Sequence, residues 1–299
     1  MADEKIETLS LSQVSRTKHY MRIGVIALPI LLIGGGLLEQ GCVTSMIDHV
    51  AFQMNAPDSA TASVPHETVM IPLNDGRRVE SRWVQATPTR SSGCTVILFN
   101  GIGGSLSDWG HAQDWLYQHH ISSIAFNYGD AAEIGNPQGK SRLGDIEKVA
   151  NGMLRTLKAK NGSGVTYFLL GHSLGSAVLL QAYPHLDTNG CAGVILCNPF
   201  SSLKAWAIEH HHLPKALSFV MPTYYDNVQN VKKLPKPLLI VSSRADTVNP
   251  PDQALEIYRA AHEPKSIKMF DRLKHNHIYD HADEYWQPIL DFITQTAGE

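Results

Sequence analysis

The sequence has few of the features that mark a disulfide-rich or nucleic-acid-binding protein. It has four cysteines among 299 residues, and its 25 Lys and Arg are outnumbered by 28 Asp and Glu. No run of basic residues offers a surface for phosphates, so we expect no nucleic-acid partner. No internal repeat or low-complexity tract occurs, and the hydrophobic content of 43% excludes a disordered chain.

The cysteines of the main body are poorly placed for pairing. Cys191 and Cys197 bracket one predicted strand, which separates them by about 20 Å. A disulfide cannot span that distance. Together with Cys94 they make an odd count, so we predict no obligatory disulfide and treat all three as small buried residues.

Metal-binding patterns are also absent, although the chain has 15 histidines. The consecutive residues His210, His211 and His212 cannot converge on one ion from a helix, and no His-Glu-x-x-His pattern occurs. We therefore expect neither a metal nor an organic cofactor.

Long hydrophobic runs are lacking, with one exception near the N-terminus. Residues 1–22 are polar and carry basic side chains, residues 23–42 hold an apolar segment, and no Lys or Arg follows Arg22 until Arg77. This asymmetry predicts a membrane-anchored protein with its body on the extracytoplasmic (periplasmic) side. The apolar core of the segment would span about 24 Å as a helix, short of a hydrocarbon layer of about 30 Å. It therefore suits a signal sequence or a short anchor.

Cys42 offers a second mode of anchoring. It follows Gly41 directly after the apolar segment, which resembles a bacterial lipoprotein processing site, although Glu39 and Gln40 are atypical there. An uncleaved anchor with an incidental cysteine and a buried N-terminal helix remain as alternatives. Residues 43–63 are interpreted as a linker.

The body of the chain, residues 64–299, alternates short apolar runs with longer amphipathic stretches. This alternation predicts an α/β fold with a mainly parallel sheet and helices on both faces. The predicted strands are 68–73, 78–85, 95–100, 122–127, 165–170, 192–197, 238–242 and 266–270, and the predicted helices are 107–119, 143–160, 176–183, 250–261 and 283–296. Residues 199–234 form an irregular, aromatic-bearing stretch that we interpret as a short lid-like insertion.

One predicted strand-to-helix junction carries a nucleophile motif. Residues 171–175 have the pattern Gly-x-Ser-x-Gly, with Ser173 at the centre, an apolar strand before it and a helical run after it. Such a turn holds the serine at strained dihedrals above the sheet, and the glycines leave the space that the turn needs. Ser173 is the predicted nucleophile, and an ordinary glycine-containing turn is the alternative.

A serine hydroxyl needs a base, and the base needs an orienting carboxylate. Asp246 lies just after the buried strand 238–242, at the edge where open α/β sheets bind ligands. Asp252 competes with it but falls at the start of the next helix, where it suits a capping role. The base is predicted to be His275 or His277, since both follow the last strand.

Acyl transfer also needs two backbone N–H donors for an oxyanion. One donor is predicted at Leu174, directly after the nucleophile. The other is predicted at Ile102, with Gly103 as the alternative, in the glycine-rich loop after strand 95–100.

Taken together, residues 64–296 resemble the α/β-hydrolase superfamily of serine esterases. They are most similar to the branch of depalmitoylating hydrolases and their exported bacterial relatives. The segments that carry the resemblance are 98–104, 171–175, 198–203, 243–246 and 275–279. In that branch an asparagine follows the catalytic histidine, which favours His275 over the alternative base His277. Asn100 departs from the family, which usually has histidine at this position.

The resemblance implies a serine hydrolase acting on small-molecule or lipid acyl esters or thioesters through an acyl-enzyme intermediate. A serine peptidase or amidase, and a non-catalytic binding module on the same scaffold, are the alternatives.

Overall fold

The computed structural model describes residues 62–73, 76–87, 93–128, 143–210, 214–215, 218, 225–279 and 283–298. The predicted polar segment 1–22, the apolar segment 23–42 with Cys42, and nearly all of the linker lie outside these residues. Within the described part of the chain, no helix is both long and apolar enough to cross a membrane.

The described residues form one eight-stranded sheet with the strand order β1-β2-β4-β3-β5-β6-β7-β8. The strands are β1 (Glu67–Pro72), β2 (Arg78–Val84), β3 (Cys94–Phe99), β4 (Ser122–Phe126), β5 (Thr166–His172), β6 (Cys191–Cys197), β7 (Leu238–Ser243) and β8 (Lys265–Phe270). β3 to β8 run parallel, whereas β2 is antiparallel to β1 and β4. The predicted fold class, an α/β fold with a mainly parallel sheet, is confirmed.

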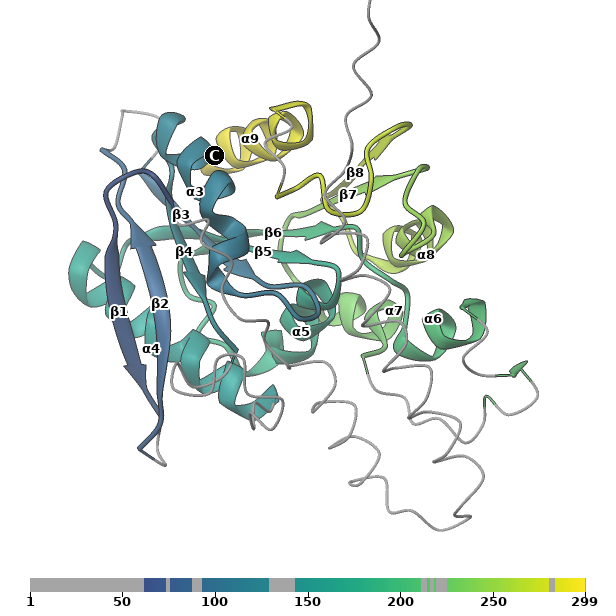
Figure 1. Ribbon diagram of the computed structural model, residues 1–299, viewed down its shortest axis with the longest axis horizontal. Helices are drawn as coiled ribbons and strands as arrows, with labels where there is room; N and C mark the ends of the chain where they lie inside the picture. The colour runs from purple at the N-terminus through teal and green to yellow at the C-terminus, as the bar shows by residue number, and fades with distance from the viewer. Residues whose placement is uncertain are drawn as a thin grey trace, which may run out of the picture.

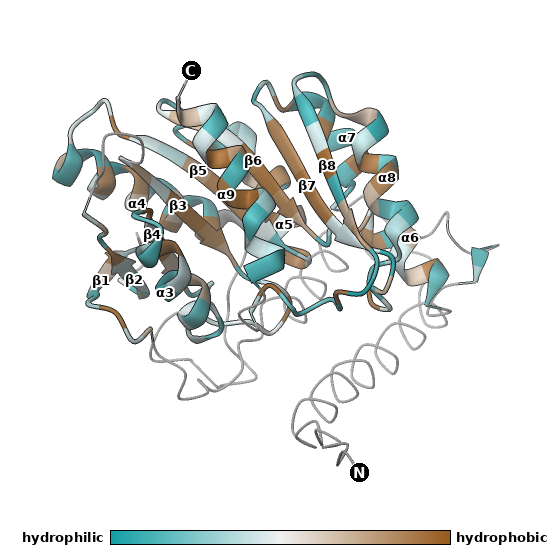
Figure 2. Ribbon diagram, turned by 90° about the horizontal axis from the view of Figure 1, so that it is seen from above, coloured by the Kyte–Doolittle hydropathy of each residue, from teal (hydrophilic) through white to brown (hydrophobic). Residues whose placement is uncertain are grey.

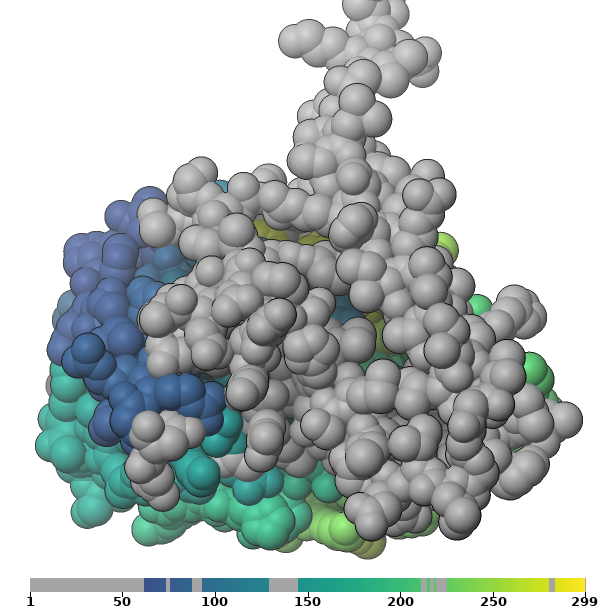
Figure 3. All heavy atoms as spheres, turned by 60° about the horizontal axis from the view of Figure 1, so that its bottom comes forward, coloured from purple at the N-terminus to yellow at the C-terminus, as the bar shows by residue number. Residues whose placement is uncertain are grey.

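The antiparallel hairpin of β1 and β2 forms one edge of the sheet. Glu67 pairs with Trp83, and Pro72 pairs with Arg78. The hairpin turn needs a residue with positive φ, and Gly76 supplies it with φ 85°. In Figure 3 this hairpin, in purple and blue, forms one flank of the molecular surface.

Helices cover both faces of the sheet (Figure 1). They are α3 (Gly110–Gln118), α4 (Leu143–Asn161), α5 (Leu174–Ala182), α6 (Leu203–Glu209), α7 (Asn227–Asn230), α8 (Pro251–Ala260) and α9 (Asp283–Ala297). α3 and α9 pack on one face, and α4, α5 and α8 pack on the other. Strand β3 shows the cause, because Val96 and Leu98 point to the first face while Ile97 and Phe99 point to the second.

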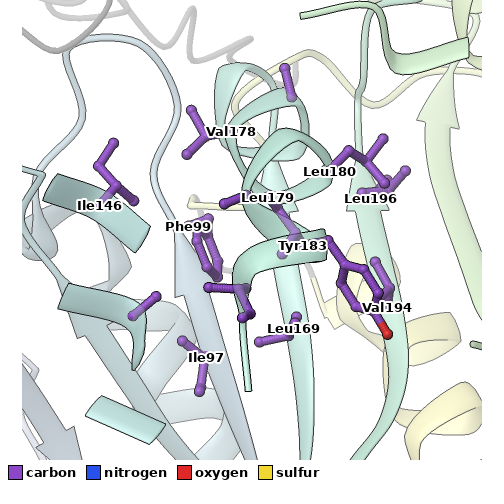
Figure 4. Packing of buried hydrophobic residues seen from close by; sticks show 14 of the residues in the cluster. Ile97, Phe99, Ile146, Leu169, Val178, Leu179, Leu180, Tyr183, Val194 and Leu196 are labelled. Carbon is purple, nitrogen blue, oxygen red and sulfur yellow. The ribbon is translucent and has the colours of Figure 1, made fainter. Parts of the chain in front are cut away.

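The central strands are apolar on both sides, as the brown colouring of β5, β6 and β7 shows in Figure 2. In Figure 4, Leu169 of β5 and Val194 of β6 lie beneath Val178 and Leu179 of α5. All four side chains are at most 1% exposed. This packing fixes β5 and α5 against each other, and the turn between them carries Ser173.

The prediction of an irregular stretch over residues 199–234 was wrong in part. It contains α6, α7 and the short 3-10 helix η5 (Val231–Lys233). The Ser202 hydroxyl caps α6 by accepting a hydrogen bond from the Ala205 N–H at 3.0 Å. The indole of Trp206 donates to the Val248 carbonyl at 3.2 Å, so α6 is attached to the loop after β7. Helices this short depend on such tertiary contacts, which periodicity does not reveal.

Candidate active site

The loops with the predicted functional residues all follow parallel strands at the same edge of the sheet. They leave the carboxyl ends of β3, β5, β6, β7 and β8, which are neighbours in the strand order. Backbone hydrogen bonds continue past the strand ends: Ser173 N–H donates to Cys197 O at 2.8 Å, and Asn198 N–H donates to Val241 O at 2.7 Å. The loop starts are therefore rigidly spaced.

Ser173 occupies a strained turn between β5 and α5. Its dihedrals are φ 53° and ψ −117°, a region that residues with a Cβ rarely adopt. The turn brings α5 very close to the end of β3, since a Cβ on Gly175 would lie 2.2 Å from Phe99 O. A Cβ on Gly171 would lie 2.5 Å from Gly175 O. The motif glycines thus permit the close approach that places Ser173, which is only 6% exposed, at the sheet edge.

The structure brings Asp246 and His275 together. Asp246 Oδ2 lies 2.7 Å from His275 Nδ1. The other carboxylate oxygen accepts the N–H groups of Val248 at 2.8 Å and Asn249 at 2.9 Å. The carboxylate, with Asp246 only 5% exposed, is therefore fully oriented. A carboxylate on Nδ1 leaves Nε2 as the ring atom available to take a proton.

The two alternative residues lie elsewhere. His277 is half-buried in the turn after His275, and its ring forms no hydrogen bond with any residue described. Asp252 is exposed in the first turn of α8. It does not cap the helix as expected, because Pro250 is the N-cap and no side chain bonds to the helix end. Its carboxylate still suits the positive end of the helix dipole.

The Ser173 hydroxyl has one hydrogen-bond partner among the described residues. Asn249 Nδ2 donates to Ser173 Oγ at 3.4 Å, and the same amide donates to Asn198 O at 2.7 Å. Ser173 and His275 form no hydrogen bond in the described structure, a geometry that substrate-free hydrolytic sites often show. Sequence reasoning missed Asn249, and its only signal was a polar residue three positions after Asp246.

The glycine-rich loop after β3 lies next to the nucleophile turn. Gly104 N–H donates to Gly101 O at 3.1 Å, and Gly103 has φ 65°, so the loop folds tightly. No described residue accepts a hydrogen bond from the N–H groups of Leu174 or Ile102. These two N–H groups can therefore donate hydrogen bonds to an anion.

Asn100, the departure from the family pattern, has a structural role. Its buried amide donates to Phe126 O at 2.7 Å and accepts a hydrogen bond from the Trp109 indole. The side chain therefore ties the start of the glycine-rich loop to β4 and to the segment preceding α3.

Metal ligands do not cluster in the part of the chain that the structure describes, where no three His, Cys, Asp or Glu side chains converge. His210 stacks on Trp206 with ring centroids 4.4 Å apart, and His211 and His212 lie outside the described residues.

This fold and this arrangement define an α/β hydrolase. Residues 67–222 match the family described as an alpha/beta hydrolase of unknown function, DUF1057, and the chain belongs to this family. The uncharacterized protein YfhR of Escherichia coli K12 is 25% identical over 232 residues, which cover 76% of this chain and 80% of YfhR. The uncharacterized protein MT2364 of Mycobacterium tuberculosis is 25% identical over 281 residues, which cover 91% and 96% of the two chains.

Solved structures with the same fold include enzymes. The esterase Pf2001 of Pyrococcus furiosus matches with a TM-score of 0.60 and 17% identity, covering 83% of this chain and 99% of that one. A soluble variant of monoglyceride lipase from Saccharomyces cerevisiae matches with a TM-score of 0.58 and 16% identity, covering 81% and 97%. At these identities the similarity shows the fold alone.

Proposed function

We propose that this protein is a serine hydrolase that cleaves acyl esters or thioesters through an acyl-enzyme intermediate. Ser173 is the nucleophile, His275 the base and Asp246 the orienting acid. The observation that carries the proposal is the 2.7 Å contact between Asp246 and His275, at the same sheet edge as a serine held at φ 53°. An oriented imidazole and a strained, motif-bearing serine are the groups that nucleophilic acyl transfer requires.

The reaction follows from these positions. His275 Nε2 takes the hydroxyl proton as Ser173 Oγ attacks the acyl carbonyl carbon. The carbonyl oxygen becomes an oxyanion that the N–H groups of Leu174 and Ile102 bind. The tetrahedral intermediate expels the alcohol or thiol, which receives the proton from His275. Water then attacks the acyl-enzyme in the same way, releasing the acid and restoring Ser173.

The proposed substrate is a small-molecule or lipid acyl ester or thioester. The Ile102 side chain is 49% exposed and extends from the proposed oxyanion loop. Trp206 and Leu203 of α6 are half-buried, and α6 is attached to the acid loop. Apolar side chains at these positions suit an acyl chain, and the structural neighbours include an esterase and a monoglyceride lipase. The resemblance to depalmitoylating hydrolases makes long-chain thioesters the first substrates to test.

Labelling with a fluorophosphonate probe tests the proposal. The folded wild-type protein is expected to label at Ser173, and Ser173→Ala is expected to abolish labelling without changing thermal stability. Asp246→Asn should reduce kcat by about 10⁴-fold, because the imidazole is held in the wrong tautomer. A folded wild-type protein that does not label would refute the proposal and favour a non-catalytic binding module.

A chain-length series of p-nitrophenyl esters and acyl thioesters separates the substrate classes. The proposal expects kcat/KM to rise with acyl length and to exceed that for the matching amides. Higher rates on amides or peptides would instead make the protein an amidase or peptidase on this fold.

We also propose that the domain acts on the extracytoplasmic side of a membrane, anchored through the segment 23–42 or a lipid on Cys42. The support is the charge asymmetry around the apolar segment. Protease treatment of spheroplasts expressing the full chain should degrade the domain, and protection until lysis would refute its export.

A further inference from the structure

A buried histidine lies directly beneath the proposed base. His172, the second residue of the nucleophile motif, is 1% exposed and uses both ring nitrogens. Nε2 lies 2.9 Å from His275 O, and Nδ1 lies 2.9 Å from the hydroxyl of Tyr279. A carbonyl can only accept, so Nε2 carries the hydrogen. In a neutral ring Nδ1 then accepts the hydrogen bond from Tyr279.

Its surroundings keep the His172 ring neutral. Burial is the largest effect that lowers the pKa of His172 well below its usual value, and the nearby His275 ring lowers it further. The two imidazoles have ring centroids 4.8 Å apart. A neutral His172 therefore places no positive charge next to the imidazolium that His275 becomes during the reaction.

The carbonyl of His275 has a second donor. Asn198 Nδ2 donates to it at 3.0 Å, and Tyr285 fixes the Asn198 amide by donating to its Oδ1 at 2.8 Å. Asn198 is fully buried at the end of β6. The backbone of the base is thus held by two donors from two neighbouring strand ends, independently of the Asp246 contact with its ring.

The same His172–Tyr279 pair packs against the proposed oxyanion loop. A Cβ on Gly101 would lie 3.2 Å from His172 Nδ1 and 3.5 Å from the Tyr279 hydroxyl. The hydrogen bond between His172 and Tyr279 therefore packs directly against Gly101. The Tyr279 ring meets Trp109 edge-on with centroids 4.9 Å apart. The pair therefore contacts the residue directly before Ile102 on one side and the base on the other.

We propose that His172 and Tyr279 form a positioning pair that sets the base and the oxyanion loop in register. His172 fixes the backbone of His275 by a hydrogen bond to its carbonyl. The hydrogen bond between His172 and Tyr279 packs against Gly101 and thereby fixes the position of the oxyanion loop. Neither residue touches the reacting atoms. This inference rests on the proposed function, because it assigns positioning roles for that reaction.

Three substitutions test the pair with a short p-nitrophenyl ester. Tyr279→Phe removes only the hydroxyl and should lower kcat about tenfold, the effect of one lost hydrogen bond. His172→Leu should lower kcat about 100-fold, as expected for a base misplaced by about 1 Å. His172→Gln, which retains an N–H donor, should recover part of that loss. KM should change little in each, because the ester itself contacts neither residue.

A double variant and a matched control separate positioning from general destabilisation. Adding Tyr279→Phe to His172→Leu should cause no further loss of kcat, because the hydrogen bond between the two residues is already absent. Tyr167→Phe is the control: it removes a buried tyrosine's bond to Asp187 O at 2.6 Å, near the other end of β5. It should keep full kcat.

The outcomes distinguish this inference from the proposed function. If the wild type neither labels with fluorophosphonate nor hydrolyses esters, the proposed function fails. If the wild type is active and Tyr279→Phe keeps full kcat, the positioning pair alone is refuted. Equal losses in Tyr279→Phe and Tyr167→Phe would also refute it, and should His172→Leu not fold, the tyrosine variants decide the matter.

Discussion

Asn249 forms hydrogen bonds with both the proposed nucleophile and the proposed acid. Its N–H donates to Asp246 and its amide donates to Ser173 Oγ and Asn198 O. In the proposed mechanism, a donor to Oγ leaves the serine proton free for His275 and favours negative charge on the oxygen as that proton departs. Under the proposed function, Asn249 would therefore influence both the nucleophile and the turn that holds the acid.

At this scale we predict that Asn249→Ala slows fluorophosphonate labelling about tenfold, the effect of one lost hydrogen bond to the nucleophile. The measurement is the second-order rate constant of labelling. Circular dichroism verifies that the variant is folded under the same conditions. Asn227→Ala is the control. Asn227 is equally buried, and its amide donates to Phe200 O at 2.7 Å but to neither Ser173 nor Asp246. Equal labelling rates in both variants would contradict the prediction.

The element that follows the proposed oxyanion loop is a short, capped 3-10 helix, η1 (Leu106–Trp109). Ser105 Oγ accepts a hydrogen bond from the Ser107 N–H, and Asp108 accepts one from the Ser105 N–H at 2.8 Å. This reciprocal capping box fixes where the chain enters the helix. Because Gly104 directly precedes Ser105, the cap also fixes one end of the loop.

We therefore predict that Ser105→Ala lowers the free energy of unfolding by about 1 kcal/mol, the usual cost of removing an N-cap hydroxyl. Urea unfolding measures this change. Ser163→Ala, on an exposed turn residue, should change the unfolding free energy by less than about 0.5 kcal/mol. An unchanged midpoint for Ser105→Ala would show that the cap contributes nothing to stability.

For the molecule as a whole, burial of weak acids predicts a loss of stability at alkaline pH. Burial raises the pKa of the Cys94 thiol to about 11 and that of Cys191 to about 12, from an ordinary value of 9.0. Above pH 9 the unfolded chain loses these protons while the folded protein keeps them, so unfolding becomes more favourable as the pH rises. The effect grows through the window from pH 9 to about 11.

Within that window each protected thiol should raise the unfolding equilibrium constant by up to about tenfold per pH unit. Urea unfolding in reducing buffer between pH 8 and 10.5 measures the slope, and Cys191→Ala should reduce it. A flat profile would contradict the burial of these thiols. Buried tyrosines such as Tyr183, whose pKa burial raises to about 12, act in the same direction.

The architecture could be predicted from the sequence because buried parallel strands are continuous apolar runs, as in β5 and β7, and because a glycine-spaced serine marks a strand-to-helix turn. The strand order could not be predicted, since crossovers leave no periodic signal. Chain order predicted that Asp246 would pair with a histidine after the last strand, and the family resemblance favoured His275 over His277. The structure places His275, and not His277, against Asp246. The contacts of His172 and Asn249 could not be predicted, because they join the ends of strands that are distant in the sequence.

The proposed nucleophile and base are separated by 102 residues, from Ser173 to His275, and each follows its own strand. During synthesis at about 5–20 residues per second, Ser173 is made roughly 5–20 s before His275. Asp246 follows Ser173 by 73 residues, so for most of that interval the serine has neither the proposed acid nor the proposed base, and we expect it to be inactive toward esters. If the proposed function holds, the position of these residues along the chain keeps the growing protein inactive until β7 and β8 have joined the sheet.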